Sequence, residues 1–160
     1  MTVHKQFLVQ AIDLARRNVE DHGGRPFGAV VVRDGAVVGT GVNEMGATGD
    51  PTAHAELQAI RAASRDLGTL RLDGCTVYAS GHPCPMCLAA MTMIGVEAVY
   101  YAHSNEDGAP FGLSTAGVYA ELARPLADQA MTIRHLPVRV EGIDLYTLWQ
   151  RRPSVAGPRS

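Results

Sequence analysis

Two short motifs constrain this chain more than any other feature of its sequence. One is Pro-Cys-Pro-Met-Cys at residues 83–87, and the other is His-Ala-Glu at residues 54–56. Two cysteines separated by two residues can hold one metal ion together. Because Pro85 follows Cys84 directly, and proline is favoured at the first position of a helix, we expect Cys84 to cap a helix whose first turn carries Cys87. The free backbone N–H groups of such a helix start favour a thiolate over a thiol, so both sulfurs are prepared to bind a cation.

His54 is a candidate third ligand from a second helix start, because the Asp-Pro-Thr that precedes it at residues 50–52 is typical of that position. Together with Cys84 and Cys87 it would leave one position of a tetrahedral zinc ion open. Structural zinc sites are normally closed by four protein ligands, so this count predicts a catalytic site. Glu56 is the candidate proton carrier. On a regular helix it would point away from His54, and its place in the first turn is what makes an approach to the metal plausible.

Each of these residue types also has a more ordinary interpretation. A CxxC pair alone can be a redox site, and a lone histidine or glutamate is more often a packing or solvated surface residue. Cys75 begins an apolar strand and is most simply a small core residue. The combination of the two motifs favours zinc catalysis over these readings.

The two motifs, about thirty residues apart, resemble the signature of the zinc-dependent cytidine deaminase superfamily. Within it, the stretches at residues 26–35 and 50–60 are most similar to those of bacterial guanine deaminases and of related nucleobase or nucleoside deaminases. The resemblance implies an α/β, three-layer cytidine deaminase-like fold with a central mixed five-stranded sheet and helices on both faces. It also implies one deaminase domain over residues 1–152. Residues 153–160 would then form a C-terminal tail that is flexible or crosses to a partner subunit, and the chain would form a homodimer.

The same resemblance implies hydrolytic deamination, in which an exocyclic amine of a nucleobase or nucleoside becomes a carbonyl and ammonia is released. Zn²⁺ would be held by His54, Cys84 and Cys87, and Glu56 would carry the protons. A guanine-type purine is the favoured substrate. Three further residues are expected to contact it: Asn43, Phe27 and Ala55. Without the resemblance, Asn43 is equally well explained as a turn residue and Phe27 as core packing.

The sequence leaves several alternatives open. The guanine deaminases of this family carry an acidic residue in the loop after the fifth strand, whereas Phe-Gly-Leu-Ser at residues 111–114 has none. A cytosine, isocytosine or aminotriazine-type base is therefore an alternative, and so is the adenosine of a tRNA. From another class, the chain could be a non-enzymatic zinc module. His82 stands where many relatives have glutamate, and it could face either the pocket or the surface.

Composition limits the partners and the location. The 160 residues carry a formal net charge of −2 and a pI of about 6.3, so no general basic field is present to bind a nucleic-acid backbone. No apolar run reaches the roughly 18 residues of a membrane span, and the N-terminus has no signal-peptide pattern. Three cysteines, two of them in CxxC, suit a reducing compartment. We therefore expect a cytoplasmic protein with a small-molecule substrate, no nucleic acid and no membrane.

Periodicity and turn residues predict the order of the elements. Residues 27–43 form two apolar runs divided by Asp34-Gly35, a strong hairpin signal. The loop at residues 104–117, rich in turn formers, is expected to help form the pocket. The predicted helices span 4–22, 52–67, 85–94, 114–122 and 145–151, and the other predicted strands span 75–80, 98–102 and 136–140.

Overall fold

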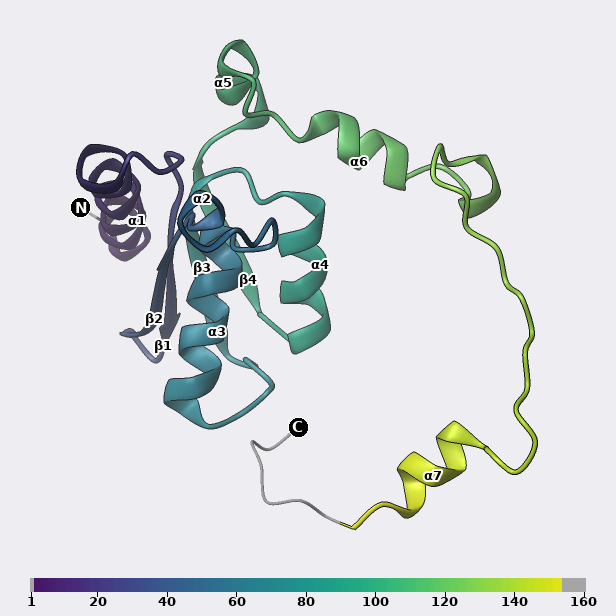
Figure 1. Cartoon of the computed structure of the whole chain (residues 1–160). Coiled ribbons are helices and arrows are strands. Elements are labelled where there is room, and N and C mark those ends of the chain that lie inside the picture. The colour runs from purple at the N-terminus through teal and green to yellow at the C-terminus, as the bar shows by residue number, and fades with distance from the viewer. Residues whose placement is uncertain (1, 154–160) are drawn as a thin grey trace.

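The computed structural model describes residues 2–153 (Figure 1). The predicted tail at 153–160 therefore lies outside the described residues, apart from Pro153. Within the described part, no helix combines the length and the apolar character needed to span a bilayer.

A mixed four-stranded sheet forms the centre of the fold, in the order β2 (Ala36–Val42), β1 (Gly28–Arg33), β3 (Cys75–Gly81), β4 (Ala98–His103). Strand β1 is antiparallel to both β2 and β3, whereas β4 runs parallel to β3. The predicted hairpin is confirmed: Asp34 and Gly35 connect β1 to β2 with φ values of 50° and 78°. Positive φ at both central residues matches the twist of the flanking strands.

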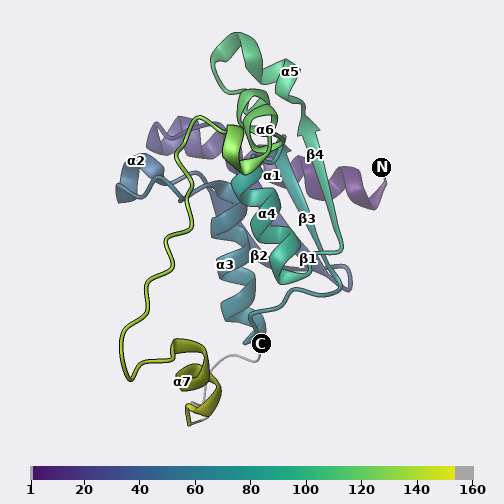
Figure 2. The same cartoon turned by 90° about the vertical axis from the view of Figure 1, so that its right-hand side faces the viewer.

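Helices cover both faces of this sheet, as expected for three layers (Figures 1 and 2). Helix α1 (Val3–His22) packs on one face, where Phe7 and Ala11 meet Val30, Val32 and Tyr78. Helices α3 (Ala55–Leu67) and α4 (Pro85–Ile94) lie on the other face. Their core is built from small and branched side chains: Ala29, Val31, Ala55, Ala59, Ile60, Ala63, Cys75, Val77, Cys87 and Met91. Cys75 is thus a buried core residue, as its place in an apolar strand indicates.

Helix α3 approaches strand β2 unusually closely, and two glycines make this approach fit. A Cβ atom on Gly41 would lie 2.5 Å from the backbone nitrogen of Ala59, and one on Gly39 would lie 2.7 Å from that of Ala63. Real Cβ contacts are not that short, so only glycine fits at either position. The start of α3, where His54 lies, is therefore positioned by direct backbone packing against β2.

The predicted fifth strand is wrong, because residues 136–140 do not join the sheet. An isolated bridge between Val140 and Ile143 is what the structure shows there. The segment carries branched residues but is exposed to solvent, and Pro137 lacks a backbone N–H for pairing. β-structure needs a neighbouring strand, and among the described residues no strand lies beside the segment to pair with it (Figure 2).

The remaining elements are short. Helix α2 (Met45–Thr48) follows β2 and was not predicted, because four residues carry no helical period. The loop after β4 folds into α5 (Asn105–Gly108) and a 3₁₀ turn at Ala109–Phe111, and α6 (Ala116–Leu122) follows. A 3₁₀ turn at Leu126–Asp128 and a long segment then lead to α7 (Leu145–Arg151), which lies apart from the sheet in both views.

Candidate active site

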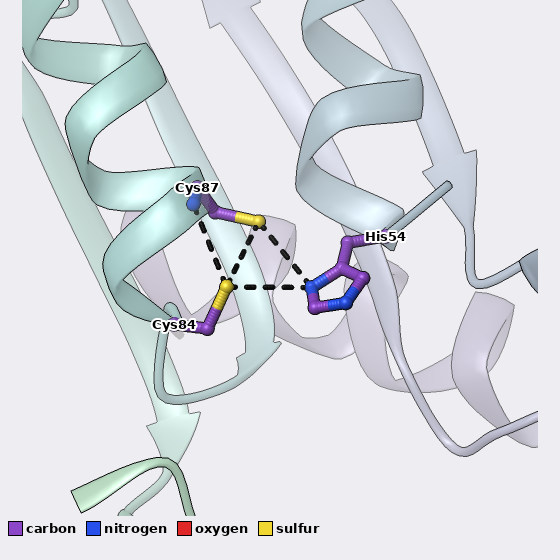
Figure 3. A group of neighbouring side chains, drawn as sticks. All are labelled: His54, Cys84 and Cys87. Carbon is purple, nitrogen blue, oxygen red and sulfur yellow. Dashed lines mark hydrogen bonds between the residues drawn. The ribbon is translucent and has the colours of Figure 1, made fainter. Parts of the chain in front are cut away.

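Three side chains converge between the starts of α3 and α4 (Figure 3). The sulfur of Cys84 lies 3.4 Å from Nδ1 of His54 and 3.5 Å from the sulfur of Cys87, and the sulfur of Cys87 lies 3.6 Å from the same nitrogen. Tetrahedral zinc with bonds of about 2.3 Å to sulfur and 2.0–2.1 Å to nitrogen would separate its ligand atoms by roughly 3.5–3.8 Å. The three residues predicted as ligands therefore fit one zinc ion at the point on which they converge.

Helix α4 presents its two cysteines in the way the sequence predicts. Cys84 is the N-cap, Pro85 is the first helical residue, and the backbone N–H of Cys87 donates to the sulfur of Cys84 at 3.5 Å. Both cysteines are buried. The helix start thus holds both sulfurs toward the metal position and directs a backbone donor at one of them.

The second helix begins later than predicted. Residue 54 is the N-cap of α3 with extended backbone (φ −72°, ψ 153°), so His54 precedes the helix instead of lying in it. The reason is local: the Oδ1 atom of Asp50 accepts hydrogen bonds from the backbone and the hydroxyl of Thr52, which closes a separate turn before the helix. This later start places Glu56 in the first helical turn, beside the histidine side chain.

The electrostatics of the metal-free ligands are those of two thiols sharing a proton. The hydrogen bond with Cys87 lowers the pKa of the Cys84 thiol to about 4, whereas the same interaction and burial raise the pKa of Cys87. The hydrogen bond with Cys84 also raises the pKa of His54, against the opposing effect of burial. Cys84 is therefore the ligand that most readily forms a thiolate, whereas the raised pKa values of Cys87 and His54 favour their protonated forms, with which a dication must compete.

Glu56 lies against this cluster and is buried, with 6% of its surface exposed. The thiol of Cys87 donates to its Oε2 atom at 3.6 Å. Removal from water, more than any other influence, raises the pKa of this carboxyl above its ordinary value. A buried carboxyl with a raised pKa beside a metal position has the properties of an acid–base group.

A cavity of about 170 Å³ opens over these residues. His54, Glu56 and Cys84 contribute to its wall, and so do all three residues expected to contact a substrate: Phe27, Asn43 and Ala55. The loop that follows β4 closes another side with residues 112–115, as expected from its position. The structure thus gathers every predicted site residue around one cavity or directly beneath it.

Asn18 supports this cavity and could not be found from the motifs. It is buried on α1, and its Nδ2 atom donates to the backbone oxygens of Arg25 and Asn43, both at 2.9 Å. It therefore fixes the position of two residues of the cavity wall. The one signal in the sequence is a polar residue within the apolar stripe of the first helix.

His82 lies at the cavity wall and stacks on Tyr101, with ring centroids 4.5 Å apart. Its ring centroid also lies 5.5 Å from that of Tyr119. The Tyr119 hydroxyl donates to the backbone oxygen of Pro83. The imidazole is thus held between two aromatic rings with one edge at the cavity. The sequence allowed His82 to face either the pocket or the surface, and in the structure it faces the pocket.

Known proteins resemble the chain in both sequence and structure. Residues 1–103 match the family described as the cytidine and deoxycytidylate deaminase zinc-binding region. The guanine deaminase of Bacillus subtilis is 38% identical over 147 residues, which covers 92% of this chain and 94% of that protein. An X-ray structure of guanine deaminase from that organism superposes with a TM-score of 0.85 over 99% of both chains, at 36% identity. The tRNA-specific adenosine deaminase of Aquifex aeolicus is 38% identical over 96 residues, or 60% of this chain and 63% of that protein.

The cysteine pair, the histidine and the buried glutamate lie within the part of the chain that matches the family. The relatives are deaminases, which are hydrolases of C–N bonds, and the zinc ligands of such an enzyme are in place here. The chain belongs to the zinc-dependent cytidine and deoxycytidylate deaminase family.

Proposed function

We propose that this chain hydrolyses the exocyclic amine of a free nucleobase or of the corresponding nucleoside. A guanine-type purine is the favoured substrate. The observation that carries the proposal is the position of Glu56, a buried carboxyl with a raised pKa that forms the wall of a ring-sized cavity beside three zinc ligands. A cavity of about 150 Å³ accepts one benzene ring, so about 170 Å³ suits a base better than a complete nucleoside.

Zinc, when bound, supplies a Lewis acid that makes water nucleophilic at neutral pH. In the proposed reaction the oxygen of one water forms a bond to the amine-bearing ring carbon. Oε2 of Glu56 takes a proton from that water and delivers it to the adjacent ring nitrogen. A second transfer through the same carboxyl protonates the amine, the C–N bond breaks, and ammonia leaves. Burial suits Glu56 to this shuttle, because the raised pKa makes the protonated carboxyl more accessible than in water.

The other wall residues would orient the ring. Three hydrogen bonds hold Asn43 in place. Its backbone N–H donates to the backbone oxygen of Phe27, and its backbone oxygen accepts from Nδ2 of Asn18. Its side-chain Oδ1 accepts from the backbone N–H of Met45 at 3.3 Å. Its amide nitrogen is then the group suited to donate to a ring carbonyl or ring nitrogen. The N–H of Ala55 is one of the first donors of α3, which have no partner within the helix. Phe27 offers an apolar face to the ring.

Ammonia release tests the proposal. Zinc-loaded protein is incubated with guanine, guanosine, adenine, cytosine, isocytosine, cytidine and aminated triazines, and Glu56→Ala is the blank. We expect release from guanine that depends on Glu56. Turnover of cytosine, isocytosine or a triazine instead would identify one of those bases as the substrate. Silence across the panel with one zinc bound per chain would refute a small-base substrate.

The similarity to tRNA-specific adenosine deaminases makes adenosine in RNA the second candidate. That activity requires binding that weakens steeply with salt, and the chain has a formal charge of −2. A tRNA anticodon stem-loop therefore joins the panel, measured at 50 and 200 mM salt. A zinc module without catalysis is disfavoured, because the metal cluster found in the described residues has three ligands instead of four.

We also propose that the chain forms a homodimer through its C-terminal part. Large apolar side chains of residues 123–152 are exposed, among them Leu136, Tyr146, Leu148 and Trp149. In Figures 1 and 2 this part runs away from the sheet instead of packing on it. Exposed apolar surface on this scale marks an interaction site. A second copy is the occupant that the family resemblance implies.

Sedimentation equilibrium tests the dimer. We expect Leu148→Asp to yield monomers at concentrations where the unaltered chain is dimeric. Val3→Asp is the matched control, because Val3 is an exposed valine at the other end of the chain. An unaltered chain that sediments as a monomer at tens of micromolar would contradict the proposal.

The free cysteines lead us to propose a cytoplasmic location. Cys84 and Cys87 have sulfurs 3.5 Å apart and are both needed as thiolates for zinc, so oxidation to a disulfide would abolish the site. A reducing compartment prevents this oxidation. Fractionation of cells that express the chain tests the location.

A further inference from the structure

The ring-sized cavity is not isolated from the surface beside it. A larger, open hollow of about 660 Å³ adjoins it, between the C-terminal end of α1 and the segment from β2 to α2. Arg25 and Asn43 line both the cavity and this outer hollow. A ligand whose ring occupies the cavity can therefore extend past these two residues into the outer hollow.

The backbone of Arg25 is held firmly at this junction. Its carbonyl oxygen accepts from Nδ2 of Asn18 at 2.9 Å and from the backbone N–H of Phe27 at 2.8 Å. The preceding residue is Gly24, where a Cβ atom would lie 2.8 Å from Cγ of Asn18, so the loop fits closely against that side chain. The guanidinium thus extends from an anchored point at the mouth of the cavity.

The guanidinium itself has no ion-pair or hydrogen-bond partner in the part of the chain that the structure describes. Glu44, an acidic residue that lines the outer hollow, accepts a hydrogen bond from Gln58 of α3 and also lines a separate hollow beside that helix. Arg25 lines the same cavity as His54 and Glu56, so its charge lies beside the metal site. A planar guanidinium with free donors matches a carboxylate or a phosphate.

We propose that the substrate is a base that bears an anionic group, a carboxylate or a phosphate, and that Arg25 binds this group in the outer hollow while the ring lies over Glu56. This inference rests on the proposed deamination and narrows its substrate class. A neutral base would fill the inner cavity and use neither the outer hollow nor the guanidinium. An anionic extension uses both, and it adds a contact that selects substrates without touching the reacting atoms.

The test compares substrates in pairs. Each neutral base of the panel is measured beside the same base with a carboxylate substituent and beside its nucleoside monophosphate, so the two kinds of anion are distinguished. We expect Arg25→Gln to raise KM for the anionic member about 10- to 100-fold, as for loss of a charged hydrogen bond, with kcat little changed. The neutral member should change less than twofold. Arg33→Gln removes an equal charge from the end of β1 and is the matched control.

A second readout does not depend on turnover. Phenylglyoxal modifies accessible arginines, and mass spectrometry locates the modified residue. Inorganic phosphate or acetate, added to the zinc-loaded protein, should slow modification of Arg25 and leave that of Arg33 unchanged. The protection should diminish as sodium chloride is raised, because the site is open to solvent.

The outcomes separate this inference from the function on which it rests. Release of ammonia from neutral bases alone, unaltered in Arg25→Gln, overturns the anionic substrate and leaves the deaminase intact. An Arg25→Gln protein that loses its dimer instead of its substrate preference shows that the guanidinium pairs across an interface, which also overturns it. The absence of Glu56-dependent release from any compound refutes the deamination itself.

Discussion

Replacing Gly41 by alanine should weaken zinc binding, although Gly41 touches no ligand. Its φ is not positive, so the backbone accepts alanine, and the effect is purely one of space. The new Cβ would lie 2.5 Å from the backbone nitrogen of Ala59 and still closer to the carbonyl of Ala55, the residue after His54. These neighbours are backbone atoms and cannot rotate away. The start of α3 must therefore move.

The size of the movement follows from the contact. Non-bonded atoms prefer about 3.5 Å, so relief of the clash requires a shift of about 1 Å. Overpacking of this kind costs about 1–3 kcal/mol of folding stability. Zinc ligands tolerate deviations of about 0.2 Å. A shift of about 1 Å at His54 exceeds this tolerance, and we expect zinc affinity to fall about 10- to 100-fold, the range seen when residues that orient ligands are lost.

Gly39→Ala is the matched control, since it creates the same kind of clash one helical turn further on, at Ala63. Both variants should lose similar stability, measured by denaturant unfolding of the metal-free protein. Zinc affinity, measured by competition with a chelator, should fall in Gly41→Ala and change less than threefold in Gly39→Ala. Equal affinities in the two variants would refute the idea that β2 positions the histidine.

The remaining predictions concern the site itself. Glu56→Gln should lower kcat about 10²- to 10⁴-fold while metal analysis still finds one zinc per chain; retained activity would end its role as proton carrier. Cys87→Ala should lose the metal, and full zinc occupancy in that variant would show a wrong ligand assignment. Zinc affinity should rise with pH, because the raised pKa values of His54 and Cys87 mean that the metal-free site holds protons which zinc must displace; a flat profile between pH 6 and 8 would contradict this. Asn18→Ala should destabilise the protein by about 1–3 kcal/mol and raise KM more than it lowers kcat, because two buried carbonyls lose their donor.

The metal cluster could be predicted because residues that are close in the sequence determine how its cysteines lie. Cys84, Pro85 and Cys87 define a helix start within four residues, and that start alone fixes how the two sulfurs lie. Glu56 was the uncertain member, since its direction depends on where α3 begins. The turn closed by Asp50 delays the helix to Ala55 and brings the carboxyl to the site.

The parts that could not be predicted depend on distant residues. Asn18 acts on Asn43 through a contact between segments 25 residues apart, and no local pattern indicates it. The prediction of a fifth strand was wrong for a related reason. Branched residues at 136–140 favour extended backbone, but they do not supply the neighbouring strand with which it would pair. A sequence pattern predicts an element well where the element's stability is local.

The N-terminal hydrogen bond of α4 has a consequence for the reactivity of the metal. Thiolates are strong electron donors, and two of them reduce the ability of zinc to polarise a fourth ligand. The backbone N–H of Cys87 points at the sulfur of Cys84 and withdraws some of that electron density. Lengthening this contact, for instance by disturbing Pro85, would make the zinc a weaker electrophile without removing any ligand. The first turn of α4 would thus tune a bound zinc ion as well as hold it.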